Sequence, residues 1–101
     1  VEGLTMAGVP DYADNNHWMN LLQIDTETYG ADREELIARL EKKGIQVRPV
    51  WKLNHLQRPY KDCQSYQIKK AEELVGMSLC LPSSTNLSDS DLLKVITNLN
   101  E

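Results

Sequence analysis

The stretch DREELIARLEKKGIQVR, residues 32–48, carries the clearest structural signals in the chain. Asp32, with Glu35 three positions later, forms a capping-box pattern at a helix start. An apolar stripe follows, made of Leu36, Ile37 and Leu40, and is typical of an amphipathic helix. Gly44 then supplies the left-handed conformation that commonly ends a helix. Residues 45–48 then read as a strand, which Pro49 ends or confines to a sheet edge. The stretch therefore predicts a helix packed on a sheet.

Regular patterns continue on both sides of this stretch. Residues 17–25 predict a strand with Trp18, Leu22 and Ile24 on one face. Residues 65–75 predict a helix, and residues 77–81 predict a short buried strand. A second capping box, from Ser88 to Asp91, begins a final helix. The apolar face of that helix is expected to comprise Leu92, Val95, Ile96 and Leu99.

The predicted order is strand, helix, strand, loop, helix, strand, helix. This order predicts an α/β (α+β) two-layer sandwich, in which a small three-stranded sheet has helices on one face. Residues 1–16 show no periodicity and are expected to be a leader or interdomain connection, with the domain itself spanning residues 17–101. Because the chain begins with Val1 rather than Met, we expect it to be a piece of a longer protein.

Composition limits the classes of function. The net charge of −4 argues against a nucleic-acid-binding protein, which normally carries a basic face. No apolar run is long enough for a membrane span. Two cysteines, Cys63 and Cys80, are too few for a disulfide framework, so we expect a reducing, cytoplasmic setting.

The candidate site is the segment RPVWKLNHLQRPY, residues 48–60, which is basic and aromatic in an otherwise acidic chain. Arg48 and Lys52 are suited to binding an anion, and His55 to hydrogen bonding or proton transfer near neutral pH. Trp51 and Tyr60 are suited to stacking on a base or a sugar ring. The alternative is a solvated basic loop that Trp51 and Leu56 pin to the core.

Other candidate chemistry is weaker. The four possible metal ligands, His17, His55, Cys63 and Cys80, lack paired ligand spacing, so we predict no metal site. The acidic pair Asp89 and Asp91 is explained as charge at a helix N-terminus. No phosphate-binding loop or catalytic triad pattern is present.

Five segments together resemble one family. They are Asn16-His17-Trp18-Met19, Arg33-Glu34-Glu35-Leu36, residues 44–52 (GIQVRPVWK), His55-Leu56-Gln57, and Leu79-Cys80-Leu81-Pro82-Ser83-Ser84 followed by Leu87-Ser88. In this order and spacing, over residues 15–100, the chain resembles the C-terminal small domain of the DegT/DnrJ/StrS sugar aminotransferases. The segment around Trp51 is most similar to enzymes that make 4-amino-4,6-dideoxy sugars, of the legionaminic acid or bacillosamine type.

The resemblance implies a fold-type-I enzyme that depends on pyridoxal phosphate. Its substrates would be glutamate and a nucleotide-linked 4-keto-6-deoxy sugar, in cell-surface polysaccharide biosynthesis. The Schiff-base lysine and most cofactor ligands would lie in a larger N-terminal domain, so the resemblance assigns no catalytic residue here and implies that this chain alone is inactive. The parent would be a cytoplasmic homodimer.

By the same resemblance, Arg48, Trp51, Lys52 and His55 would face the substrate cleft. The stretch Leu53-Asn54-His55 departs from the pattern of many family members, which carry a proline just before the histidine segment, so the role of His55 stays open. Two alternatives to the aminotransferase hypothesis stay open. One is an independent module that binds a small metabolite through residues 48–60, and the other is an interaction domain that docks on a larger partner.

Overall fold

The computed structural model describes residues 1–101 and is built around a four-stranded antiparallel sheet. The strand order is β1-β2-β4-β3, with bounds Leu4–Met6 (β1), Asn20–Ile24 (β2), Arg48–Pro49 (β3) and Ser78–Leu81 (β4). The α-helices are Thr26–Tyr29 (α1), Arg33–Lys42 (α2), Lys69–Gly76 (α3) and Asp89–Leu99 (α4), and Asn54–Leu56 (η1) and Arg58–Tyr60 (η2) are 3-10 turns. None of the helices has the length and apolar content needed to cross a bilayer.

The predicted α/β class and the order of the main elements are confirmed, but the predicted strand count was wrong. The additional strand, β1, lies inside residues 1–16, which were expected to be a connection. It is an edge strand of three residues, and pairing places Leu4 opposite Ile24 and Met6 opposite Leu22. A strand this short has too few residues to show alternation, and the pairing with β2 stabilises it instead. The division of the chain at residue 16 stays a prediction.

Strand pairing separates the two faces of the sheet. Residues that are directly paired across neighbouring strands point to the same face. On the inner face, Leu22 lies opposite Leu79, and both are buried in the core. On the outer face, Leu21, Cys80 and Arg48 form one row across three strands. The core consists of Leu22, Ile24, Leu36, Leu40, Ile45, Val47, Leu79, Val95 and Leu99.

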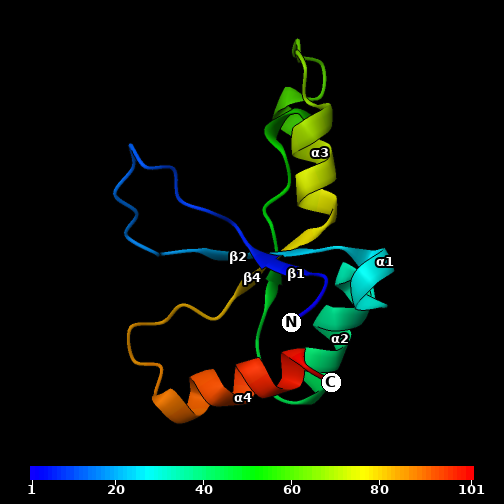
Figure 1. Ribbon diagram of the computed structural model, residues 1–101. Helices are drawn as coiled ribbons and strands as arrows, with labels where there is room; N and C mark the ends of the chain where they lie inside the picture. The colour runs from blue at the N-terminus through cyan, green and yellow to red at the C-terminus, as the bar shows by residue number, and fades with distance from the viewer.

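The helices that cover the sheet lie on one of its faces, while α3 extends away from the other side. Figure 1 shows α2 and α4 on one side of the sheet and α3 on the other. α3 has no fully buried residue, so it does not extend the core. The radius of gyration is 15.2 Å, whereas a compact domain of this length has about 13 Å. α3 therefore belongs to a projection rather than to the sandwich.

The strongest sequence prediction, the helix after Asp32, is confirmed in detail. Asp32 and Glu35 make both hydrogen bonds of the capping box, with N···O distances of 2.9 Å each. Gly44 has a φ of 71°, the left-handed conformation that ends the helix. The capping box at Ser88 and Asp91 is also present and begins α4.

Three predicted boundaries were displaced. The strand predicted over residues 17–25 begins only at Asn20, because His17 adopts a left-handed φ of 53° and Trp18 lies outside the sheet. The helix predicted from residue 65 begins at Lys69, since Gln67 has a φ of 50°.

The strand predicted over residues 45–48 is reduced to β3, although Ile45 and Val47 are buried in the core. β3 is an edge strand, as Pro49 requires.

The apolar face of α4 is only half covered. Val95 and Leu99 are buried against the sheet, while Leu92 and Ile96 remain exposed. These two side chains border an apolar groove of about 360 Å³ between α4 and the first two strands. Apart from Asn20 and Pro82, the groove is lined by Val1, Leu4, Met6, Leu22, Leu81, Leu92, Val95, Ile96 and Leu99. The groove is a concave apolar surface that no part of this chain fills.

Leu36→Ala is expected to lower the free energy of unfolding by about 2–5 kcal/mol, because Leu36 has no exposed surface and its removal leaves a cavity. Urea denaturation followed by circular dichroism measures the change. Leu93→Ala is the matched control, since Leu93 is exposed on α4 and its loss should change stability by less than about 0.5 kcal/mol. Equal effects of the two substitutions would contradict the described core.

Candidate functional site

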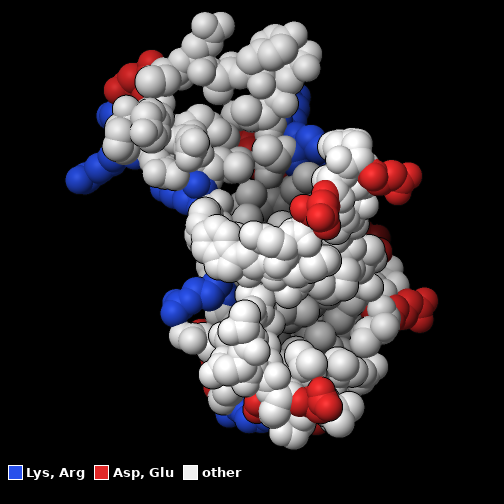
Figure 2. Space-filling model, turned by 90° about the vertical axis from the view of Figure 1, so that its left-hand side faces the viewer, with Lys and Arg blue, Asp and Glu red and all other residues white.

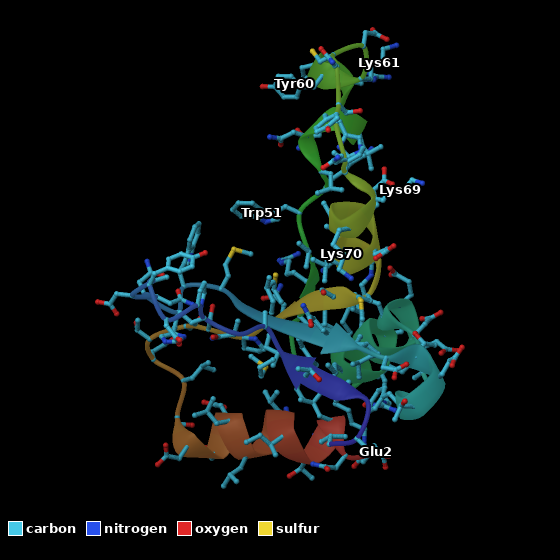
Figure 3. The ribbon with its side chains drawn as sticks, turned by 45° about the horizontal axis from the view of Figure 1, so that its top comes forward. Glu2, Trp51, Tyr60, Lys61, Lys69 and Lys70 are labelled. Carbon is cyan, nitrogen blue, oxygen red and sulfur yellow. The ribbon has the colours of Figure 1, made fainter.

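Residues 50–77, which connect β3 to β4, form a projection that we call the arm. The arm contains η1, η2 and α3 and rises from the outer face of the sheet (Figure 1). Trp51 lies at its base, and Tyr60 and Lys61 lie toward its tip (Figure 3). Residues 50–70 carry five Lys or Arg and a single acidic residue, Asp62. Figure 2 shows Lys and Arg side chains gathered on this upper part of the molecule.

A cavity of about 250 Å³ lies where the arm leaves the sheet. It is bounded by residues from the chain before β2, from β3 and β4, and from the base of the arm. Its lining residues are Trp18, Met19, Gln46, Arg48, Trp51, Cys80, Leu81, Pro82 and Ser83. The cavity combines one cation, two indoles and several apolar side chains, a composition suited to a ligand with both a ring and an anionic group.

Two of the four predicted substrate-binding residues, Arg48 and Trp51, line this cavity. Arg48 lies in β3 opposite Cys80, so pairing directs it to the outer face. Its guanidinium makes no ion pair within the chain, which leaves its hydrogen-bond donors free for an external anion. Trp51 lies two residues after the end of β3 and is 67% exposed. The loop's sequence thus brings a cation and an aromatic ring together at one place.

The other two predicted residues, Lys52 and His55, do not line the cavity. The carbonyl oxygen of Lys52 accepts a hydrogen bond from Nε2 of Gln57 at 2.9 Å, a contact that shapes the loop. His55 Nε2 lies 3.1 Å from Oε1 of Glu72 on α3. The His55 side chain is only 19% exposed and extends from η1 to α3. In this structure His55 joins the two halves of the arm.

Sequence reasoning from the residues alone missed Trp18 as a site residue. Trp18 was expected in a strand, on the same face as Leu22 and Ile24, but it lies outside the sheet, is 66% exposed and is close to Trp51. The two ring centroids are 6.0 Å apart and the ring planes meet at 74°, an edge-to-face arrangement. The available signal was the pair Asn15-Asn16 just before it, because asparagine favours turns over a continued strand.

The cavity has no obvious nucleophile or metal site. Burial raises the pKa of the Cys80 thiol, so this side chain stays protonated near neutral pH. No group of three or more His, Cys, Asp or Glu side chains converges anywhere in the structure. The two carboxyl groups with lowered pKa, Asp25 and Asp91, accept hydrogen bonds from Thr28 and Ser88 and serve as helix caps.

Comparison with known proteins matches this chain to a single family. The profile of the DegT/DnrJ/EryC1/StrS aminotransferase family matches residues 1–100. EpsN of Bacillus subtilis, named as a pyridoxal phosphate-dependent aminotransferase, is 29% identical over 94 residues, which cover 87% of this chain and 24% of EpsN. GDP-perosamine synthase of Caulobacter vibrioides is 30% identical over 84 residues, which cover 83% of this chain and 22% of that enzyme.

A solved structure shows the same fold. DesI, crystallised in the presence of its TDP-sugar product, superposes with a TM-score of 0.83 and 26% sequence identity. The superposition covers 96% of this chain and 25% of DesI. The chain therefore spans about a quarter of the length of the proteins it matches.

Alkylation by iodoacetamide at pH 8 is expected to modify Cys63 at least about tenfold faster than Cys80, because the thiolate is the reactive species. Cys63 is exposed, whereas burial raises the pKa of Cys80 and limits access to it. Peptide mass spectrometry at successive times measures both rates. In urea the two cysteines should react at similar rates, and the same ratio in urea would show that burial is not the cause.

Glu72→Ala is expected to loosen the arm, because it removes the acceptor that holds His55. Amide hydrogen exchange in residues 52–60 should become about fivefold faster, the effect of losing an interaction of about 1 kcal/mol. Glu73→Ala is the matched control, since the side chain of the neighbouring Glu73 pairs only with the exposed Lys70, at 3.3 Å. Unchanged exchange in Glu72→Ala would show that the arm does not depend on this contact.

Proposed function

Because the chain belongs to the DegT/DnrJ/EryC1/StrS aminotransferase family, we propose that it serves as the small domain of a sugar aminotransferase. In the proposed reaction, an amino group passes from glutamate to the keto carbon of a nucleotide-linked 4-keto-6-deoxy sugar. The observation that carries the proposal is the cavity at the base of the arm, where Arg48 and Trp51 converge in a chain whose family match covers residues 1–100. The names of two matched proteins, GDP-perosamine synthase and DesI with its TDP-sugar product, support a nucleotide sugar as substrate.

The family implies pyridoxal phosphate, but the residues of this chain do not form its site. A lysine that binds this cofactor covalently works in an enclosed pocket beside an acid and phosphate ligands. All seven lysines here are exposed to solvent. When bound elsewhere in the enzyme, pyridoxal phosphate would supply the electron sink for the transfer. The residues of this chain would bind and orient the substrate.

The uncovered groove beside α4 also supports a role as one domain among others. Exposed concave apolar surfaces of this kind are usually covered by another domain or a partner. In an aminotransferase, a larger domain would cover part of this surface and complete the substrate cleft. We further propose that the enzyme is a cytoplasmic homodimer in cell-surface polysaccharide biosynthesis. The two free cysteines fit a reducing compartment.

Each of the four predicted substrate-binding residues has a physical role in this proposal. Arg48 offers a planar set of donors to the substrate carboxylate or to a diphosphate oxygen. Trp51 presents an apolar ring surface to the sugar. Lys52 lies one residue further along the loop and adds positive charge near the same ligand. His55 acts indirectly, because its contact with Glu72 holds the loop that carries Trp51.

Arg48→Ala in the full-length holoenzyme is expected to lower kcat/KM for one substrate by about 10- to 100-fold, the effect of losing a charge-assisted hydrogen bond. Steady-state kinetics with glutamate and the nucleotide sugar varied in turn show which substrate Arg48 binds. Arg58→Ala is the control, because Arg58 is exposed on η2 away from the cavity. His55→Ala should have a smaller effect, through loop order. Unchanged kcat/KM for both substrates in Arg48→Ala and Trp51→Ala would contradict the proposed site.

A further inference from the structure

Trp18 is held in an exposed position by its neighbours. The backbone N–H of His17 donates to Oδ1 of Asn15 at 2.9 Å, and the backbone N–H of Trp18 donates to Oδ1 of Asn16 at 3.0 Å. On the other side, the hydroxyl of Ser83 donates to the carbonyl oxygen of Trp18 at 2.6 Å. His17 also adopts a left-handed φ of 53°, which is unfavourable for a residue with a side chain. Several local contacts thus fix a conformation that a simple connection does not need.

In this position the large apolar ring of Trp18 is exposed to water. Trp18 is 66% exposed although the apolar core lies only a few residues away, at Leu22. Its only aromatic neighbour is Trp51, which comes from the arm and is itself 67% exposed. Two edge-to-face indoles from distant parts of the chain bury little of each other, so most of both rings remains available for contact.

The surroundings of the two indoles indicate the kind of ligand. Arg48 lies in the same cavity and has no ion-pair partner in the chain. Gln46 and Ser83 add hydrogen-bonding groups, while Leu81 and Pro82 add apolar surface. Aromatic rings stack on bases and on the C–H faces of sugars, and a guanidinium binds phosphate. A nucleotide sugar offers all of these groups in one molecule.

We propose that Trp18 is a specificity-determining residue, which contacts a ring of the nucleotide-sugar substrate directly, together with Trp51. This inference rests on the proposed function, because it assumes that the cavity binds that substrate. Trp18 would act only on the sugar substrate, since glutamate has no ring to contact. Ser83 is a positioning residue in this scheme, because its hydroxyl holds the carbonyl of Trp18.

The test uses the full-length holoenzyme with glutamate and three acceptors: TDP-4-keto-6-deoxyglucose, GDP-4-keto-6-deoxymannose and a UDP-linked 4-keto-6-deoxy sugar. The best acceptor is used for the variants. Trp18→Ala should lower kcat/KM for the sugar about tenfold, as expected for a lost stacking contact, and leave kcat/KM for glutamate within about twofold. Trp18→Phe keeps a ring and should retain most of the activity.

The matched control is Tyr12→Ala, because Tyr12 is an aromatic residue in the same β1–β2 connection, 92% exposed and outside the cavity. It should change neither kcat/KM value. Equal losses for both substrates in Trp18→Ala, or a change in its melting temperature or assembly, would assign Trp18 to a structural contact and overturn the inference. Normal kinetics in Trp18→Ala beside impaired Arg48→Ala would overturn this inference alone. Turnover of none of the three acceptors would overturn the proposed function and this inference with it.

Discussion

The antiparallel pairing of β2 with β4 is the interaction on which the rest of the structure depends. It joins residues 20–23 to residues 78–81 at the centre of the sheet. On one face it places Leu22 against Leu79, the pair on which α2 and α4 complete the core. On the other face it places Leu21 beside Cys80, and beyond the strand ends it brings Ser83 next to Trp18. The pairing of β3 with β4 then adds Arg48 to the same row. A one-residue shift in register would exchange the two faces, so it would remove the core and the cavity together.

Local signals predicted those parts of the fold that local interactions stabilise. The helix after Asp32 and the helix after Ser88 have caps, an apolar stripe and a defined start, all within a few residues of each other. β1 and the direction of the arm depend on contacts with residues far along the chain, so no local sequence pattern predicted them. The exposed position of Trp18 follows from hydrogen bonds to asparagine side chains and to Ser83. The spacing of Trp18 from Leu22 and Ile24 matches the alternation of a strand, which is why sequence reasoning placed all three on one strand face.

The sequence predicted only part of the candidate site, because the rest depends on contacts between distant segments. Composition identified residues 48–60 as unusual, and Arg48 and Trp51 indeed lie together at a cavity. Composition carries no information on which side chains of a loop point toward a cavity. The sequence prediction therefore grouped His55 with Arg48 and Trp51. The pairing of His55 with Glu72 involves residues 17 positions apart, across the turn of the arm. The other half of the cavity comes from segments before β2 and after β4, which only the folded sheet brings into place.

The arm begins and ends on neighbouring strands, since Pro49 at its start is paired with Leu79 just beyond its end. In topological terms it is one long hairpin loop, anchored at a single point of the sheet. Insertions or deletions near its tip would therefore leave the register of β3 and β4 unchanged. Such an arrangement separates evolution of the ligand-facing surface from evolution of the scaffold. Related domains can accordingly diverge in the length and sequence of the arm while keeping the same sandwich beneath it.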